Sequence, residues 1–146
     1  MATYATNKRA FFDYEILEKF EAGLVLTGGE VKSIRTNSVR LTGSYVVFHG
    51  DSAYLINLHI PKYRMAGPSI PHSVERTRKL LLKAKEINYL RGKSEEQGLT
   101  IIPLSVYTRG SLLKVEVGVA RGKKKYDKRE KIKKRDLKRD MKKERG

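Results

Sequence analysis

Residues 99–120 read LTIIPLSVYTRGSLLKVEVGVA, and this stretch decides the fold. Apolar residues alternate with polar or small ones from 113 to 119, and apolar residues recur less regularly from 99 to 107. A period of two residues is typical of a half-buried strand. Arg109 and Gly110 lie between the two segments and supply a turn. The stretch therefore predicts an antiparallel hairpin whose inner face belongs to a core.

Two further strands are predicted upstream of this hairpin. The segments 44–49 and 52–60 are rich in apolar residues, and Gly50 and Asp51 between them supply a turn. Large apolar residues occupy every second position of the second segment. The range 61–71 holds three prolines and a glycine and is predicted as a loop.

The remaining segments supply one more strand and two helices. Mixed alternation from 12 to 20 predicts a strand that continues past Gly23. The range 30–35 is predicted as a short helix because two of its apolar residues lie three positions apart. The range 77–90 lacks Pro and Gly and is rich in strong helix formers, so it is predicted as a long helix that Gly92 interrupts.

Together these elements predict a mainly β chain of the α+β class with five or six strands. Antiparallel strands of this kind must close on themselves or pair to hide their edges. A small antiparallel oligonucleotide-binding-type barrel with flanking helices and a basic C-terminal tail is the simplest arrangement. A half-open sheet packed on the long helix is the alternative. We predict a mobile N-terminal arm at 1–10, a β-barrel domain at 11–120 and a tail at 121–146.

Positive charge is concentrated at the C-terminus. The chain has a formal net charge of +16, and residues 121–146 alone contain 15 Lys and Arg against 5 Asp and Glu. A folded domain does not need such a surplus, because like charges oppose compaction. Nucleic acid is the leading polyanionic partner and an anionic membrane surface is the second. We predict that the tail is disordered when free and helical once RNA phosphates neutralise it.

The sequence holds no recognisable catalytic or metal-binding arrangement. It has no cysteine, which removes thiolate ligands and cysteine nucleophiles. His49, His59 and His72 have no partner at metal-ligand spacing and are interpreted as surface or structural residues. No P-loop, GxSxG or HExxH pattern occurs. We therefore expect no metal, no cofactor and no enzymatic activity.

Membrane insertion and export are not expected either. No stretch approaches the ~20 consecutive apolar residues that a membrane-spanning helix needs. The N-terminus lacks the apolar core of a secretory signal. The chain is therefore expected in the cytoplasm, without a membrane partner.

Basic residues form four separate clusters. They lie at 8–9, at 32–35, at 76–85 and in the tail. Any one cluster is typical of a solvated surface, but four of them together with the net charge favour binding to RNA. The chain has no tryptophan and only four phenylalanines. This composition favours recognition of the shape and backbone of RNA over recognition of individual bases. The domain at 11–120 is therefore predicted to bind RNA.

Several short blocks of sequence stand in a specific order. They read FDYEILE at 12–18, FEAGLVL at 20–26, EVKSIR at 30–35, RTRKLLL at 76–82 and KVEVGVA at 114–120, followed by GKK at 122–124 and DKR at 127–129. Together these blocks resemble the small protein B family, the tmRNA-binding proteins of bacterial trans-translation. Each block is weak alone, but the set covers the chain from about residue 7 to residue 129.

The resemblance implies a barrel that binds the tRNA-like part of tmRNA around its D-loop and elbow. The implied RNA contacts of the body are Asn7, Lys8, Glu21, Lys32, Arg35, Leu81 and Lys83. The cations suit phosphates, Glu21 suits a base amine or a 2′-hydroxyl, and Leu81 suits the face of a base. The alternative interpretations are a strand-edge charge for Glu21 and a core helix position for Leu81.

The resemblance also implies that the tail enters a stalled ribosome whose mRNA channel is empty. The implied contacts with the decoding region and the channel are Gly122, Lys123, Lys124, Tyr126, Asp127, Lys128, Arg129 and Leu137. The implied protein is a monomer whose partners are tmRNA and the ribosome. It would admit alanyl-tmRNA to the ribosome without a codon. Two other interpretations stay open: a structural ribosomal protein bound to rRNA, and an enzyme acting on RNA.

Overall fold

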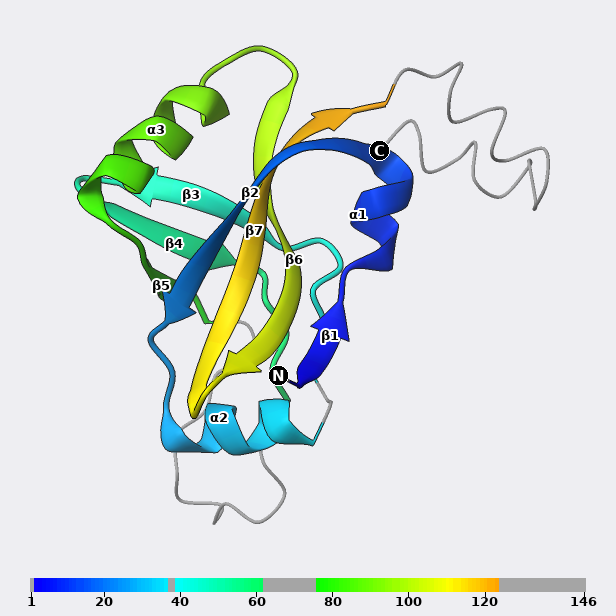
Figure 1. Cartoon of the computed structure of the whole chain (residues 1–146), viewed down its shortest axis with the longest axis vertical. Helices are drawn as coiled ribbons and strands as arrows, with labels where there is room; N and C mark the ends of the chain where they lie inside the picture. The colour runs from blue at the N-terminus through cyan, green and yellow to red at the C-terminus, as the bar shows by residue number, and fades with distance from the viewer. Residues whose placement is uncertain (1, 37–38, 62–75, 124–146) are drawn as a thin grey trace, which may run out of the picture.

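The computed structural model describes residues 2–36, 39–61 and 76–123 of the chain (Figure 1). Within these ranges it contains seven strands and three helices. In chain order they are β1 (Thr3–Thr6), α1 (Lys8–Asp13), β2 (Tyr14–Leu24), α2 (Gly28–Arg35), β3 (Tyr45–His49), β4 (Ser52–Ile56), β5 (Arg78–Leu81), α3 (Ala84–Ser94), β6 (Leu99–Arg109) and β7 (Leu112–Gly122).

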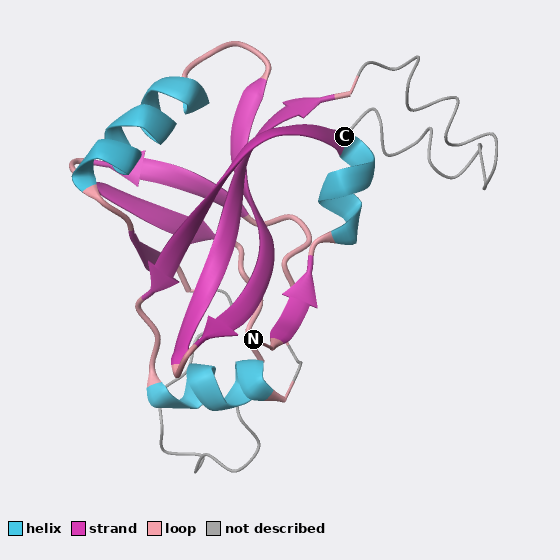
Figure 2. Cartoon of the chain, viewed as in Figure 1, coloured by secondary structure: helices cyan, strands magenta, loops and turns pink. Residues whose placement is uncertain are grey.

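One antiparallel sheet forms the body of the protein. Its strand order is β1-β6-β7-β2-β5-β4-β3. The terminal strand β3 also packs against β6, so the sheet curls round into a barrel. Figure 2 shows the helices outside the strands, with α2 at the end of the barrel where β6 turns into β7 and α3 beside β3. The predicted mainly β, barrel-like fold with flanking helices is confirmed.

The β6–β7 hairpin lies inside this sheet, between β1 and β2. Gly110 has a φ of 64° and allows the tight turn between Arg109 and Leu112. The alternating valines of β7 are fully buried, as the sequence pattern predicts: Val115, Val117 and Val119. They pack in one hydrophobic core with buried residues of β2, β3, β4, β5, β6, α2 and α3.

The N-terminal segment differs from the predicted arm. Thr3–Thr6 forms β1, which pairs with β6, and Lys8 begins α1. Between them, Asn7 accepts a hydrogen bond from the Ala10 N–H at 3.1 Å and donates one from Nδ2 to the Pro103 carbonyl at 2.9 Å. The prediction of an arm without regular structure is wrong for residues 3–10. Hydrogen bonds of the backbone and of the Asn7 amide hold this segment to β6. Because such bonds do not require a pattern of apolar residues, the sequence does not reveal them.

The predicted long helix at 77–90 is also corrected. Arg78–Leu81 is strand β5, and α3 begins only at Ala84 and then runs through Gly92. In β5, Arg78 and Leu80 point inward and are buried, whereas Lys79 and Leu81 point outward and are exposed. Burial of alternate residues between β2 and β4 therefore outweighs the local helix propensity of this leucine-rich segment.

Smaller boundary differences have local causes. β2 begins two residues later than predicted, because the residues before it belong to α1. β4 ends before Asn57, whose φ of 62° does not continue a strand. α2 begins two residues earlier, behind a capping box formed by Thr27 and Glu30. Most of the predicted loop at 61–71 lies outside the described residues.

A buried ion network ties α2 to β5. The side chains of Arg78 and Glu30 are 0% and 1% exposed, and Arg78 donates to Glu30 Oε2 from Nε at 2.9 Å and from Nη2 at 2.5 Å. Arg76 donates from Nη2 to Oε1 of the same carboxylate at 2.6 Å. Burial raises the pKa of Glu30, but hydrogen bonds from the Thr27 backbone and both guanidinium groups outweigh it and hold that pKa below its ordinary value. Arg78 belongs to the predicted basic cluster at 76–85, but it is buried and stabilises the fold.

Candidate RNA-binding site

Three of the predicted RNA-binding residues line one groove. Glu21 belongs to β2 and Leu81 to β5, and Lys83 is the residue that precedes α3. The groove has a volume of about 680 Å³, and its other charged lining residues are Asp51, Lys79, Glu86 and Lys114. Residues 60 positions apart in the sequence thus converge on one surface, because β2 and β5 are neighbours in the sheet.

Leu81 is exposed on this surface and rests against a glycine. Gly23 of β2 pairs with Leu81 across the β2–β5 ladder. A Cβ atom at position 23 would lie only 3.2 Å from the Leu81 Cβ, so glycine permits the close approach. Leu81 is nevertheless 55% exposed, which leaves an apolar side chain open beside charged neighbours. The interpretation of Leu81 as a core helix residue is therefore wrong.

Glu21 is held by two donors from β6. The Tyr107 hydroxyl donates to Glu21 Oε2 at 2.6 Å, and Arg109 Nε donates to the same oxygen at 2.8 Å. The hydrogen bonds from Tyr107 and then Arg109 lower the pKa of Glu21. Burial, together with the bond to Glu21, raises the pKa of Tyr107 to about 12. Glu21 is thus an ionised acceptor whose carboxylate is fixed in direction.

The lining of the groove is balanced in charge. Three lysines, Lys79, Lys83 and Lys114, stand against three carboxylates, those of Glu21, Asp51 and Glu86. The large positive surplus of the chain therefore resides elsewhere, above all in the range 121–146. Such a surface favours recognition by individually placed donors, acceptors and apolar contacts over attraction by net charge alone.

Lys32 and Arg35 lie at the α2 end of the barrel and do not line the groove. Both are exposed in the last turn of α2. Arg35 Nη2 donates to the Ser111 carbonyl at 3.4 Å, which ties α2 to the β6–β7 turn. Figure 1 shows α2 directly beyond that turn. These two cations form a second patch, which we call the α2 patch.

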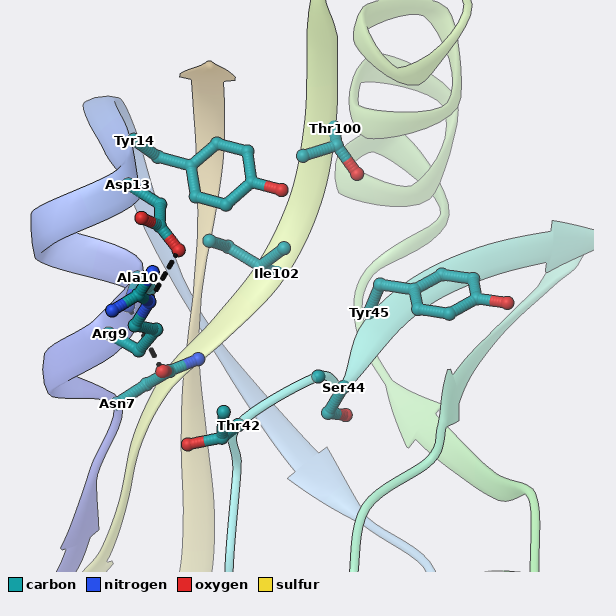
Figure 3. A pocket seen from close by; sticks show the side chains of 11 residues that line it. Asn7, Arg9, Ala10, Asp13, Tyr14, Thr42, Ser44, Tyr45, Thr100 and Ile102 are labelled. Atoms are coloured by element: carbon teal, nitrogen blue, oxygen red, sulfur yellow. Dashed lines mark hydrogen bonds and ion pairs between the residues drawn. The ribbon is translucent and has the colours of Figure 1, made fainter. Parts of the chain in front are cut away.

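The predicted contacts Asn7 and Lys8 lie apart from both surfaces. Lys8 is exposed, but Asn7 is only 5% exposed and its polar atoms bond to Ala10 and Pro103. Asn7 lines a separate pocket of about 540 Å³ between α1 and the start of β3. Figure 3 shows it there, with Tyr14 and Tyr45 on opposite sides of the pocket. The structure thus gives Asn7 a capping role.

The start of the predicted tail belongs to the barrel. Gly122 is the last residue of β7, and the Lys123 backbone N–H donates to the Asp13 carbonyl at 3.1 Å. Lys123 Nζ donates to the Phe11 carbonyl at 3.3 Å. The other predicted tail contacts lie outside the described residues: Lys124, Tyr126, Asp127, Lys128, Arg129 and Leu137.

Sequence reasoning missed the residues that support Glu21. The sequence indicates a strand residue for Tyr107, which could stack on a base or fill the strand, a turn residue for Arg109 and the polar half of an alternating pattern for Lys114. Their place beside Glu21 depends on the register of β6 and β7 against β2. Alternation shows which side of a strand a residue occupies, but it does not show its neighbour two strands away.

Two kinds of feature are absent from the described residues. No helix among 2–36, 39–61 and 76–123 is long and apolar enough to cross a membrane. Over the same ranges, no group of three or more His, Cys, Asp or Glu side chains is arranged to hold a metal ion.

The barrel, the groove and the surrounding cations define a small β-barrel RNA-binding protein. A family model described as "SmpB protein" matches residues 4–146. The chain belongs to this family, so the resemblance seen in the sequence blocks is confirmed.

Relatives and a solved structure agree with this assignment. The SsrA-binding protein of Thermosipho melanesiensis is 53% identical over 141 residues, covering 95% of each chain. That of Acaryochloris marina is 51% identical over 135 residues, covering 92% of this chain and 88% of the relative. A solved structure described as "tmRNA-SmpB: a journey to the center of the bacterial ribosome" contains a similar chain with a TM-score of 0.72 and 41% identity. The match covers 94% of this chain and 97% of the other.

Proposed function

We propose that this protein binds the tRNA-like domain of tmRNA and delivers it to stalled ribosomes for trans-translation. The observation that carries this proposal is the convergence of Glu21, Leu81 and Lys83 in one groove. Relatives at about 50% identity are named for binding the same RNA, which is also called SsrA. The outcome is rescue of the ribosome and tagging of the unfinished peptide.

The groove offers three kinds of contact to structured RNA. The exposed Leu81 packs on the face of an unpaired base, and the ionised Glu21 accepts from a base amine or a 2′-hydroxyl. Lys83 contacts a phosphate, as do Lys32 and Arg35 of the α2 patch. These contacts orient the tRNA-like domain on the barrel.

The basic tail acts on a different partner. Residues 121–146 carry 15 Lys and Arg against 5 Asp and Glu, a surplus that suits rRNA phosphates in the empty decoding site and mRNA channel. We propose that Lys124, Tyr126, Asp127, Lys128, Arg129 and Leu137 make these contacts and that the tail becomes helical there. Through the tail, the protein admits alanyl-tmRNA without a codon.

The protein acts in this scheme as a cytoplasmic monomer without a cofactor and without catalysis. The second candidate, a structural ribosomal protein bound to rRNA, is less favoured, because the relatives' name refers to SsrA and the similar solved structure includes tmRNA. Incubation with labelled RNA and a divalent metal tests the third candidate, an RNA-processing enzyme. Specific cleavage would establish that activity.

Sequencing of the RNA that co-purifies with the tagged protein at moderate salt tests the proposed function. We expect tmRNA in nearly equal molar amount, whereas recovery of rRNA alone would support the ribosomal-protein alternative.

Leu81→Ala should weaken binding of the isolated tRNA-like domain at least about fivefold, the loss of ~1 kcal/mol typical of an interface anchor. The matched control is Leu17→Ala, because Leu17 is an exposed leucine of β2 that does not line the groove.

A further inference from the structure

We infer that Arg109 is a further RNA-binding residue, a phosphate contact that Glu21 and Tyr107 hold in place between the groove and the α2 patch. This inference rests on the proposed function and extends its binding surface. It also gives Glu21 a positioning role in addition to the direct contact proposed above.

The guanidinium of Arg109 is anchored on one edge and open on the other. Its Nε donates to Glu21 Oε2 at 2.8 Å, and the side chain is 63% exposed. Over the described part of the chain, its two Nη groups donate to no carboxylate or carbonyl oxygen, and the Tyr107 hydroxyl is a further polar neighbour of the guanidinium. A guanidinium presents its donors as a rigid fork, so the edge between the two Nη atoms remains free to bind a phosphate in bidentate fashion.

Tyr107 fixes the anchor of Arg109. The Tyr107 side chain is only 8% exposed, and its hydroxyl donates at 2.6 Å to the same Glu21 oxygen that accepts from Arg109. Tyr107 and Arg109 lie two positions apart on β6, and β7 separates them from Glu21 on β2. The core therefore determines where the carboxylate points, and the carboxylate determines where the guanidinium points. Preorganisation of a long side chain reduces the entropy that binding costs.

The position of Arg109 joins two surfaces that are otherwise separate. Glu21, on one side of it, lines the groove. On the other side, the Ser111 carbonyl in the same turn accepts a hydrogen bond from Arg35 of the α2 patch. An RNA backbone that runs from the groove to the α2 patch therefore passes Arg109. Because the groove itself is balanced in charge, an added cation at this point is well placed to set the path of the phosphates.

The test compares Arg109→Gln and Arg109→Lys in the full chain, with the tRNA-like domain of tmRNA as the probe. Filter binding over a series of salt concentrations gives both the affinity and its salt slope. Arg109→Gln should lower affinity about tenfold and reduce the slope by roughly 0.7–0.9, the value for one phosphate contact. Arg109→Lys should restore the slope but only part of the affinity, because lysine lacks the fork.

Arg121→Gln is the matched control. Arg121 is an exposed arginine near the end of β7, it lies 3.7 Å from the carboxylate of Glu15, and it does not line the groove. Its loss should leave affinity and slope nearly unchanged. Thermal unfolding of each variant checks that the barrel is intact, as expected because exposed ion pairs contribute little to folding stability.

A double-mutant cycle tests the positioning role. If Glu21 acts partly by holding Arg109, the combined Glu21→Gln and Arg109→Gln variant should bind more tightly than the product of the two single effects predicts. Tyr107→Phe should weaken binding severalfold without altering the salt slope, because no phosphate contact is removed.

The outcomes separate the inference from the proposed function. If the unaltered chain binds tmRNA while Arg109→Gln matches Arg121→Gln in affinity and slope, the inference is overturned and the proposed function stands. Additive effects of Glu21→Gln and Arg109→Gln would overturn the positioning role. If the unaltered chain does not bind tmRNA at all, the proposed function itself fails.

Discussion

Gly23 shows how a missing side chain shapes the groove. Its backbone lies so close to Leu81 that a Cβ atom would stand 3.2 Å from the Leu81 Cβ. We expect Gly23→Val to push Leu81 away, to cost about 1–3 kcal/mol in stability, as overpacking does, and to weaken binding of the tRNA-like domain. Denaturant unfolding and filter binding measure the two effects.

Gly28→Ala is the control for this substitution. Gly28 is the first residue of α2, and a Cβ atom there would meet nothing within 4 Å. The RNA affinity and the stability of the Gly28→Ala variant should stay close to those of the unaltered chain. Equal affinities for Gly23→Val and Gly28→Ala would show that the position of Leu81 does not matter for RNA binding.

Glu30 carries a buried charge that matters for stability. Glu30→Gln keeps the side-chain size and the bond to Thr27 but leaves Arg78 buried without its counter-charge. Removing one partner of a buried pair costs about 3–5 kcal/mol. We expect a loss of this size in denaturant unfolding at neutral pH, whereas Glu95→Gln, at an exposed position after α3, should change little.

The contribution of Glu30 should also depend on pH. Because its pKa in the folded chain lies below the ordinary value of 4.5, the unfolded chain takes up the proton first as pH falls. The stabilisation is therefore complete above pH 4.5 and is lost as pH falls through the folded-state pKa. The stability difference between the unaltered chain and Glu30→Gln should shrink over that interval, and a constant difference would contradict this account.

At the scale of elements, α1 depends on its cap. Asn7 bonds through Oδ1 to the Ala10 N–H and through Nδ2 to the Pro103 carbonyl, so it joins α1 to β6. We expect Asn7→Ala to cost about 1–2 kcal/mol, the usual effect of losing an N-cap, without changing RNA affinity where the protein is fully folded. Lys8→Ala, at the exposed neighbouring position, is the control for stability. A fall in affinity without a fall in stability would instead make Asn7 a direct RNA contact.

The elements also show which sequence signals can be trusted. The β6–β7 hairpin was predicted correctly, because alternation and the turn at Gly110 both act locally. β5 was predicted as a helix, because its leucines and lysines favour one when considered alone. Its strand conformation depends on partners far away in the sequence, namely β2, β4 and the buried Glu30. The prediction therefore placed Leu81 wrongly in a helix, and its role in RNA binding stays a prediction.

At the scale of the whole molecule, the body and the tail should be separable. Arg121 and Gly122 complete β7, and Lys123 bonds to the carbonyls of Phe11 and Asp13, so a clean truncation falls after Lys123. We expect this truncation to leave binding of the tRNA-like domain nearly intact and to abolish tagging on stalled ribosomes. Filter binding and a reconstituted tagging assay measure the two activities. Proportional loss of both would contradict the division of labour.

The sequence alone determined the family, the mainly β architecture and the uneven distribution of charge, because motif blocks, alternation and composition are local properties of a chain. Only the tertiary structure decided that Arg78 is buried against Glu30, that Leu81 is exposed on a strand, and that Asn7 is a cap. It also decided that Tyr107 and Arg109 meet at Glu21. These features depend on strand register and on pairing across long sequence separations, which a one-dimensional pattern does not contain.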